Sequence, residues 1–427
     1  MIERECPVFF STAGPENHFF GYYDKSPIDR SGERLLSHRA AFDFKRLPHA
    51  DDVIEIGYWN LDDGRYDAVA TTRAYNWQQG AQLQWLGPDH ETRIIFNDRD
   101  GETFVSRVVD LSGNLIRTLP FPVYTVASNG SLAICVNYPR LSWAHVGYHY
   151  EGAKDARWSG SLPDGDGLFR LDLKSAEVER IIRTRDLTQF EPLTSMKGAL
   201  HYVEHAMFNP SGSRFHFHHR WMLPDGGIYG RLFAANPDGS ELRLLLDTGY
   251  VSHCGWRDDE TVVGWGRPAS PVGALRRSRF ISRAVLKPLL PLYHALTSRV
   301  PAAREKLLGD TYIVCEDRPH AEKPRVLTSQ RFPGDGHCTW RPGDDRWMLT
   351  DTYEDADSYR NLLLYDARED RIVRIGRFYS LPETNSTGWR ADLHPRWDYS
   401  GRSVCIDSTH TGQRQMHVID VSEIVGA

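Results

Sequence analysis

One short pattern recurs along this chain and limits the folds that the chain can adopt. In its clearest copy, residues 251–265, His253 precedes Trp256 by three positions, and a short polar turn and an apolar strand follow. Six further segments keep this frame, three of them with a histidine and one of those three with phenylalanine in place of the tryptophan. The residues at the histidine position of these six segments are Lys25, Gln82, Val123, His205, His337 and His394. Self-similarity of this kind is typical of a repeat architecture.

Each copy has the features of one blade of a β-propeller. A strand, a tight turn of polar or glycine residues and a second strand are followed by further strands, as in residues 167–173. The copies lie roughly forty to eighty residues apart, which suits a four-stranded blade with loop insertions. We therefore predict an all-β, seven-bladed propeller in which the innermost strand of each blade begins at one mouth of the central channel. The seven frame positions then form a ring, and four histidines face a shared space.

The N-terminal segment 7–11 is predicted to close this propeller. It has the pattern of a short strand without a partner in its own repeat. Pairing with residues 415–421 would complete the last blade and remove its exposed edge. Closed repeat architectures run long as a single unit, so we expect residues 1–427 to form one domain.

The composition argues against several classes of function. A net charge of −6 gives no signal for nucleic-acid binding. The six cysteines are scattered without paired spacing, which argues against a zinc knuckle or a disulfide framework. The sequence contains neither a signal-peptide core nor a run of about twenty apolar residues, so we expect a cytoplasmic protein without a transmembrane segment.

Residues 267–310 interrupt the fifth blade after its second strand. The segment is rich in arginine and lysine, and its apolar residues follow a helical period that Pro288 and Pro291 break. Three interpretations are open: contact with an anionic membrane surface, self-association into a homo-oligomer, or a basic lid over an acidic ligand. We favour a lid or an oligomer contact, because the prolines divide the apolar face into short pieces.

The ring histidines indicate a site more strongly as a set than singly. One histidine at such a position is more often structural, but four at one repeat position, beside Gln82 and Lys25, favour a shared site. Imidazoles that converge with oxygen donors suit Zn²⁺ or Mn²⁺, and a further histidine or arginine supplies a base and an anion clamp. The sequence has no nucleophile elbow, P-loop or HExxH motif. Asp351, Asp355 and Asp392 are available as carboxylates, but their spacing singles out no glycosidase pair.

The first inner strand begins in residues 17–27, which are dense in aromatic and polar side chains. Two interpretations are open for this segment. Either His18, Tyr22 or Tyr23 and Lys25 reach the mouth, or the segment is a packed aromatic corner.

Blades three and four add further polar side chains near this mouth. Residues 139–165 form a loop that either walls a cleft or shields the strands. In the second strand of blade four, alternation places His216 and His218 on one face and His219 on the other. On the third strand Arg231 can lean over the mouth, although a surface arginine is normally solvated.

At these residues the sequence resembles the oligogalacturonate lyases, seven-bladed propeller enzymes that cleave short uronic-acid oligomers by β-elimination with a divalent metal, usually manganese. The resemblance is spread over most of the chain and is specific in patches. Residues 252–256 look like the family's T-H-E-F-W, whose histidine is the catalytic base, which implies that role for His253. Residues 205–233 are similar to the family's blade-four segment. This match places His219 on the histidine of the second strand and Arg231 on the arginine that neutralises the substrate carboxylate.

The resemblance also implies a metal site. His337 falls on a metal-ligand histidine of the family. Residues 392–397 are similar to the family's H-P-H-P-x-F, in which both histidines are ligands. His394 keeps the second of these, whereas Asp392 stands at the first and Trp389 stands at the position of a glutamine ligand. An aspartate is an acceptable Mn²⁺ ligand. The ligands that we expect are His337, Asp392, His394, Gln82 and His205, for Mn²⁺ first, with Zn²⁺ or Ca²⁺ as alternatives.

We therefore expect a lyase that acts on a small uronate-containing oligosaccharide. His253 takes the C5 proton, Arg231 and the metal stabilise the resulting charge, and Tyr23 or a water protonates the leaving O4 atom. His219 is expected as a further catalytic residue beside these groups. The side chains that we expect to bind the substrate are His18, Tyr22, Lys25, His218, Arg220 and Arg396. The alternatives are a non-catalytic propeller that binds sugar or a protein partner, and a glycoside hydrolase on the same scaffold.

Overall fold

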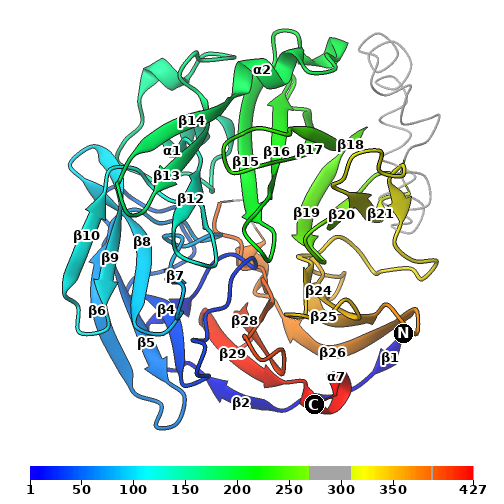
Figure 1. Ribbon diagram of the computed structural model, residues 1–427. Coiled ribbons are helices and arrows are strands. Elements are labelled where there is room, and N and C mark those ends of the chain that lie inside the picture. The colour runs from blue at the N-terminus through cyan, green and yellow to red at the C-terminus, as the bar shows by residue number, and fades with distance from the viewer. Residues whose placement is uncertain (269–308, 386–387, 427) are drawn as a thin grey trace.

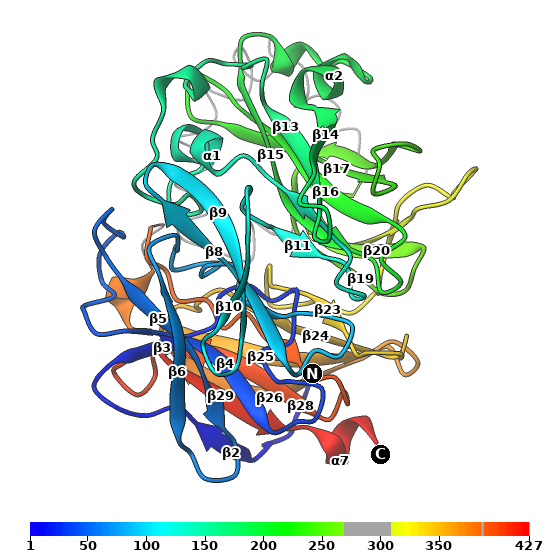
Figure 2. The same cartoon turned by 60° about the vertical axis from the view of Figure 1, so that its left-hand side comes forward.

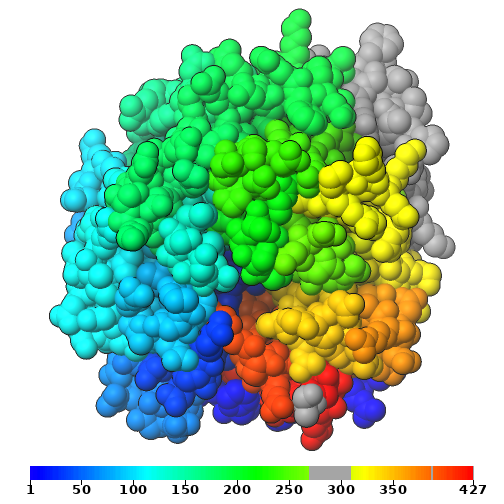
Figure 3. All heavy atoms as spheres, viewed as in Figure 1, coloured from blue at the N-terminus to red at the C-terminus, as the bar shows by residue number. Residues whose placement is uncertain are grey.

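The computed structural model describes residues 1–268, 309–385 and 388–426. Within these ranges the strands form seven sheets, which stand as blades around a central axis (Figure 1). A narrow hollow remains at the centre of the ring of blades in the space-filling view (Figure 3). The expected all-β, seven-bladed propeller is therefore confirmed.

The first four blades come from consecutive stretches of the chain. Blade one contains β3 (Asn17–Phe19), β4 (Arg34–Ala40), β5 (Ile54–Asn60) and β6 (Tyr66–Thr72). Blade two contains β7 (Gln84–Trp85), β8 (Arg93–Asp100), β9 (Thr103–Asp110) and β10 (Leu115–Leu119). Blade three contains β11 (Thr125–Val126), β12 (Leu132–Cys135), β13 (Gly167–Asp172) and β14 (Val178–Arg183). Blade four contains β15 (Leu200–Phe208), β16 (Phe215–Met222), β17 (Ile228–Ala235) and β18 (Arg243–Gly249).

The last two blades each include a strand from the N-terminus. Blade five contains β19 (Val251–Trp256), β20 (Thr261–Gly266), β21 (Thr311–Glu316) and β22 (Arg325–Val326). Blade six contains β23 (Thr339–Trp340), β24 (Trp347–Asp351), β25 (Tyr359–Asp366), β26 (Arg371–Tyr379) and β1 (Ile2–Glu3). Blade seven contains β27 (Arg396–Trp397), β28 (Ser403–Ser408), β29 (Gln415–Asp420) and β2 (Val8–Ser11).

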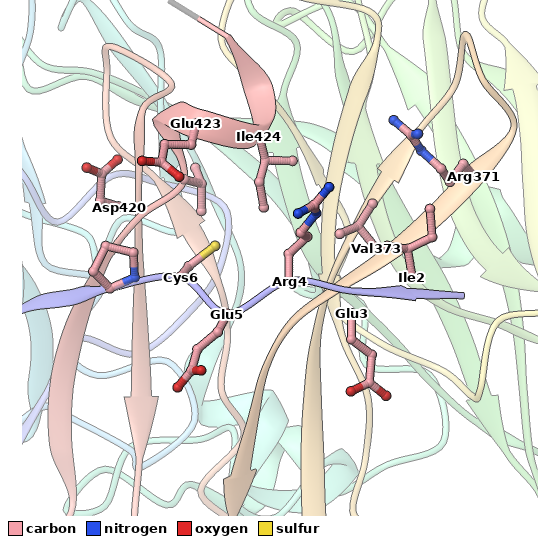
Figure 4. A pocket seen from close by; sticks show the side chains of 12 residues that line it. Ile2, Glu3, Arg4, Glu5, Cys6, Arg371, Val373, Asp420, Glu423 and Ile424 are labelled. Carbon is pink, nitrogen blue, oxygen red and sulfur yellow. The ribbon is translucent and has the colours of Figure 1, made fainter.

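The N-terminal segment joins the outer edges of blades six and seven. β2 pairs antiparallel with β29, as the sequence predicts, with Phe10 opposite Val418. β1 adds a parallel pairing to β26, with Ile2 opposite Val373, which the sequence does not reveal because two residues carry no periodicity. Between these strands the chain spans a pocket, with Arg4 and Cys6 pointing to one side and Glu3 and Glu5 to the other (Figure 4). The segment therefore closes the ring at two adjacent blades.

The repeated tryptophan joins a blade to the one before it. Trp85 of blade two donates from Nε1 to the carbonyl oxygen of Pro27 at 2.9 Å, and Trp256 of blade five donates to that of Met207 at 2.9 Å. Each acceptor lies two positions after the frame residue of the preceding blade, Lys25 or His205. A large apolar ring with one donor can fill an interblade contact and still satisfy its N–H group. This contact explains why the pattern repeats.

The described helices are short, and all except α7, which follows β29, lie in connections between strands. Their bounds are α1 (Tyr138–Ala144), η1 (Ala156–Trp158), α2 (Thr184–Gln189), η2 (Thr194–Met196), η4 (Pro382–Thr384) and α7 (Ser422–Val425). α1 begins where the Asn137 side chain accepts a hydrogen bond from the Arg140 N–H, with Pro139 in the first turn. Both α1 and α2 contact β15 (Figure 2). In the part of the chain that the structure describes, none of the helices has the length and apolar character needed to cross a bilayer.

The insertion predicted at residues 267–310 leaves and re-enters blade five between β20 and β21. Its two ends are tied together, because the Arg267 guanidinium donates to the Asp310 carboxylate at 2.8 Å. β20 ends opposite Val251, where the innermost strand of the blade begins, so these ends lie on the ring side of the blade. The expected helices, and their roles as a lid, an oligomer contact or a membrane contact, fall on residues 269–308, outside the described ranges.

Candidate active site

The ring positions share a break in the strand geometry. Gln82, His205 and His394 have positive φ angles of 53°, 53° and 42°, which are uncommon for residues other than glycine. At His253 the pairing of β19 with β20 shifts its register between Val251 and Cys254. Such irregularities re-aim a side chain, and strained backbone of this kind is concentrated at functional sites.

Two tyrosines from the connection between β3 and β4 fill the middle of the ring. The Tyr22 ring lies 5.4 Å from the His205 ring and 5.4 Å from the His394 ring, measured between centroids. The Tyr23 ring lies 5.1 Å from the His337 ring and 6.0 Å from the His253 ring. The four ring histidines therefore surround one space, although Tyr22 separates His205 from His394.

Hydrogen bonds fix both tyrosine hydroxyls. The Tyr22 hydroxyl is 2.7 Å from His205 Nδ1. The Tyr23 hydroxyl donates to the Cys254 carbonyl at 2.9 Å and accepts from the Cys254 N–H at 3.1 Å. Because its donor and acceptor are both used by the backbone, Tyr23 is poorly placed for the expected proton transfer to a substrate.

Arg396 holds this tyrosine segment in place and does not face a substrate. Its guanidinium donates to the carbonyl oxygens of Gly21 and Tyr22, and it pairs with Asp407 at 2.9 Å. Both charged side chains are fully buried. The expected substrate contact is therefore replaced by a structural role, since all the donor nitrogens of Arg396 already have acceptors within the chain.

Three of the expected metal ligands come together. Single ligand atoms of His337, Asp392 and His394 lie within 4.8 Å of one another, and all three residues are buried. His337 Nδ1 donates to the Asp351 carboxylate at 2.9 Å, which leaves the lone pair on Nε2. A carboxylate behind a histidine in this way orients the imidazole for a metal and raises its basicity.

Three ring nitrogens of this triad have no hydrogen-bond partner among the described residues. His337 Nε2 and both ring nitrogens of His394 are buried without a hydrogen bond. A buried polar group left unpaired costs about 1–3 kcal/mol, so a bound cation would relieve this penalty at one nitrogen of each imidazole. His216 also has unpaired ring nitrogens, but only the triad gathers three ligand atoms in the described ranges. The donor set of two imidazoles and one carboxylate fits Mn²⁺ or Zn²⁺.

Two arginines keep the aspartate of the triad ionised. Asp392 accepts from Arg360 at 2.5 Å and from Arg390 at 2.6 Å. Burial alone would raise the pKa of this carboxyl group, but the charges of Arg390 and Arg360 hold it well below its usual range. Burial and the neighbouring His337 hold the pKa of His394 well below its usual value. Asp392 therefore presents an anionic ligand and His394 a neutral one, as divalent metal binding requires.

His253 stands beside the triad but has its own carboxylate. Its ring centroid lies 3.9 Å from that of His337. Its Nδ1 donates to Asp335 at 3.1 Å, with Ser252 also within 3.2 Å. Nε2 has no hydrogen bond to any described residue, and burial, followed by the proximity of His337, lowers the pKa of the imidazole. His253 is therefore neutral at pH 7, with a lone pair on Nε2 that can accept a proton.

A charged cluster from blade four borders the other side of the ring. The buried Glu204 carboxylate lies 2.7 Å from Arg220, 2.6 Å from His145 and 3.3 Å from His205. His218 contacts this cluster through Arg220 at 3.2 Å. His218 and Arg220, both expected to bind substrate, thus lie beside the ring. His145 and Tyr148, whose rings stack at 4.2 Å, show that the loop after β12 walls this side.

His219 and Arg231 are not part of the ring. Arg231 is fully buried, and its guanidinium donates to the carbonyl oxygens of Leu187 and Phe190 at the end of α2. His219 faces His201 at 3.1 Å and lies 3.5 Å from Arg231. Strand alternation explains this placement, because His219 and Arg231 are opposite each other on the face of β16 and β17 that His218 does not share. The expected roles as catalytic histidine and carboxylate clamp therefore do not fit these positions.

His18 is also remote from the ring. It is buried between Trp59 and Tyr66, with ring centroids 5.0 Å and 5.6 Å away. These partners belong to the outer strands β5 and β6, so the side chain leaves the axis. The packing of His18 therefore agrees with the aromatic-corner interpretation and gives this side chain no contact with a substrate.

Gln82 and Lys25 lie at the ring but bind each other. Lys25 Nζ donates to Gln82 Oε1 at 3.0 Å and pairs with Asp24 at 2.6 Å. Burial lowers the pKa of Lys25, whereas Asp24 raises it. Gln82 also donates to Gln79, so both atoms of its amide are bonded within the chain, and His205 is not among the three clustered ligands. Gln82 and His205, both expected as metal ligands, are therefore hydrogen-bonded to other side chains of the chain.

Three residues that the sequence does not single out complete the site. Asp335 stands two positions before His337, and Arg390 stands two positions before Asp392. Tyr353 follows the second strand of blade six, and its ring lies 6.1 Å from that of His253. For Asp335 and Arg390 the only sequence signal is their proximity to a ring position, and Tyr353 has none, because connections between strands have no periodicity.

Comparisons with known proteins support the fold. No known family profile matches the sequence, and no curated protein matches it. A structure described as an oligogalacturonate lyase in complex with manganese has a TM-score of 0.60 at 15% identity, over 96% of this chain and 92% of the other. An oligogalacturonate lyase from Vibrio parahaemolyticus has a TM-score of 0.58 at 14% identity, over 97% and 93%. The β-propeller domain of the Trilobed protease from Pyrococcus furiosus has a TM-score of 0.50 at 11% identity, over 94% and 95%. This chain therefore shares its fold with proteins of different activities.

Proposed function

We propose that this chain is a lyase that cleaves a uronate-containing oligosaccharide by metal-assisted β-elimination. The observation that carries the proposal is the position of His253. Its carboxylate-backed imidazole presents a free Nε2 beside the buried triad of His337, Asp392 and His394. The shared fold of two structures described as oligogalacturonate lyases, one of them in complex with manganese, supports the same reaction class.

The triad would hold the divalent cation, for which we propose Mn²⁺ first and Zn²⁺ or Ca²⁺ as alternatives. When bound, such an ion supplies Lewis-acid polarisation of a substrate oxygen. Asp351 orients His337, and Arg360 and Arg390 orient Asp392, so the ligands are fixed before an ion binds. The buried position of the three side chains limits the competition of water with the substrate.

His253 would take the proton from C5 of the uronate. The hydrogen bond from Nδ1 to Asp335 sets the tautomer that leaves Nε2 free, and it stabilises the imidazolium that forms. A C5 proton is too weakly acidic for an imidazole unless the developing carboxylate charge is held by a cation beside it. A cationic side chain near His253 is therefore part of the requirement.

Arg390 meets this requirement better than Arg231. Its Nε donates to Asp392, while its two terminal nitrogens have no hydrogen bond to the described residues. The guanidinium stands 4.9 Å from the centre of the Tyr353 ring, which itself lies 6.1 Å from the His253 ring. A planar guanidinium with free terminal N–H groups suits bidentate binding of a carboxylate. We assign to Arg390 the role of binding the substrate carboxylate.

The test is an ultraviolet assay with purified protein, Mn²⁺ and a panel of uronate oligosaccharides. Elimination creates a conjugated double bond, so the absorbance should rise with at least one substrate. His253→Ala should retain the metal and still bind the oligosaccharide but lose turnover by roughly 10²–10⁴-fold, as expected for loss of a general base. Arg368→Ala on the exposed surface is the matched control and should be fully active.

Two results would contradict the proposal. Tight binding of an acidic oligosaccharide without any absorbance change would favour a binding module. Release of reducing ends without a double bond would indicate a hydrolase. A further result would revise only the role of His253. Loss of metal from His253→Ala would make His253 a metal ligand, and the base would then be sought at His218.

A further inference from the structure

A tyrosine beside the proposed base has no assigned role. Tyr353 lies in the connection between β24 and β25, two positions after Asp351, the residue that orients His337. Its ring centroid is 6.1 Å from that of His253 and 6.3 Å from that of His337. The connection therefore places one aromatic side chain against both the proposed base and a proposed ligand.

Two arginines hold the Tyr353 ring. The guanidinium carbon of Arg390 lies 4.9 Å from the ring centroid, and that of Arg360 lies 5.9 Å from it. Both arginines are bound to Asp392, so the ring is tied to the carboxylate of the triad. Cations at these distances attract the face of an aromatic ring and restrict its orientation. Tyr353 is thus positioned by the same network that builds the site.

The Tyr353 hydroxyl differs from those of the central tyrosines. The hydroxyls of Tyr22 and Tyr23 are bonded to His205 and to the Cys254 backbone. Tyr353 is half-buried. Its hydroxyl has no hydrogen bond to a described residue, and it is not among the polar atoms that are buried from solvent without a partner. A hydroxyl that is held near a base, but is free and reachable, can donate to a bound molecule.

We propose that Tyr353 donates the proton to the leaving O4 atom in the elimination proposed above, on which this inference rests. His253 Nε2 takes the proton from C5, and the C5–H electron pair forms the C4–C5 double bond. The C4–O4 bond breaks, and O4 takes the proton from the Tyr353 hydroxyl. The imidazolium then returns its proton through water to the tyrosinate, so the cycle leaves no net change in protonation. Because C5 and O4 are neighbours on one sugar ring, acid and base must face a common space, as these two residues do.

Tyr148 is the competing candidate, since its hydroxyl also has no hydrogen bond among the described residues. Its ring, however, stacks on His145 and meets His205 edge-on at 5.6 Å. The ring contacts of Tyr148 are thus with His145 and His205, whereas the ring of Tyr353 contacts that of His253. The two tyrosines can be compared directly by the same substitution.

The experiment compares two leaving groups in the holoenzyme with Mn²⁺. One substrate is a uronate oligosaccharide, whose sugar alcohol must be protonated as it leaves. The other is a uronide with 4-nitrophenolate at C4, which leaves without a proton. Tyr353→Phe should lose roughly 10²–10⁴-fold in kcat on the oligosaccharide, as for loss of a general acid, and less than about tenfold on the aryl substrate. Turnover of the aryl substrate also shows that the variant is folded.

Matched variants separate the outcomes. Tyr359→Phe, at the start of β25 in the same blade, and Tyr148→Phe should each change neither rate by more than about twofold, since neither ring faces His253. Equal losses on both substrates, or no loss on either, would overturn the role of Tyr353 while leaving the lyase reaction in place. A selective loss on the oligosaccharide in Tyr148→Phe would move the role to Tyr148. A wild-type chain that cleaves neither substrate would overturn the lyase proposal and this inference together.

Discussion

The four histidines at one repeat position differ in the groups to which their imidazole nitrogens are hydrogen-bonded. His205 is bonded to Tyr22 and Glu204, His253 to Asp335, and His337 to Asp351, whereas His394 has no hydrogen bond to a described residue. A ring nitrogen that is already bonded is lost to metal binding, and the partner decides which nitrogen remains free. The chemistry of each imidazole therefore follows from its partner more than from its place in the repeat.

The first prediction uses this difference to separate ligands from structural histidines. Replacement of His337 or His394 with alanine should remove bound Mn²⁺, because each change leaves only two of the three clustered ligands. His205→Ala, a change at the same repeat position, should leave the metal content unchanged. Elemental analysis of the purified variants provides the measurement. Full metal occupancy in His337→Ala and His394→Ala would show that the triad is not the metal site.

The choice of arginine shows the limit of sequence reasoning at this scale. Arg231 matches a family motif, yet strand alternation and the end of α2 bury it on the other face of blade four. Arg390 matches no motif, but it stands two residues from Asp392 in a connection between blades. Repeat position predicts which side chains reach the ring. It cannot predict which cations from the connecting segments approach them.

At the scale of single elements, the segment that carries Tyr22 and Tyr23 depends on one ion pair. Arg396 from β27 binds Asp407 from β28 and holds the carbonyl oxygens of Gly21 and Tyr22. Asp407 also accepts from the backbone N–H groups of Phe20 and Gly21. The segment that carries Tyr22 and Tyr23 belongs to blade one and is therefore attached at several points to the adjoining blade seven.

The second prediction concerns this ion pair. Arg396→Ala should lower the free energy of unfolding by about 3–5 kcal/mol, because it leaves the fully buried Asp407 carboxylate with only the more distant Arg414 guanidinium, at 3.8 Å, as a cationic partner among the described residues. Arg368→Ala, which removes an exposed partner of Asp345, should cost no more than about 1 kcal/mol. Urea denaturation of both variants gives the comparison. A loss at Arg396 no larger than at Arg368 would show that the pair does not anchor the segment.

Strand elements could be predicted well, and their connections could not. The frame of histidine, tryptophan, turn and strand gave the seven inner strands and the closing strand β2, because alternation and turn residues are local signals. β1 was missed because two residues have no pattern of their own. The segments that carry Asp335, Tyr353 and Arg390 are held by tertiary contacts, so their residues give no periodic signal.

At the scale of the whole molecule, many imidazoles are buried in the neutral state. Burial lowers the pKa of His18 to about 4 and of His38, His216 and His417 to about 3. These four residues lie outside the proposed ligand set. In the unfolded chain each would titrate near its ordinary value of about 6.5.

The third prediction follows from the sign of these shifts. Between pH 6.5 and about 4 the unfolded chain binds protons that the folded chain does not, so acid favours unfolding. The stabilising contribution is complete above pH 6.5 and decreases as the pH falls, by up to about 1.4 kcal/mol per pH unit for each histidine. Urea unfolding at pH 7.5, 6.5 and 5.5 measures this slope. A free energy of unfolding that stays constant down to pH 5.5 would contradict the buried neutral state.

The pairing of β2 with β29 and of β1 with β26 also has a consequence for biosynthesis. β1 and β2 are made long before their partners β26 and β29, so they must wait, unpaired, until blades six and seven are made. Contacts of such long sequence separation form late in folding. The proposed ligands His337, Asp392 and His394 lie in the same two blades or just before them. The three proposed ligands can therefore come together only after the chain of blades six and seven has been made.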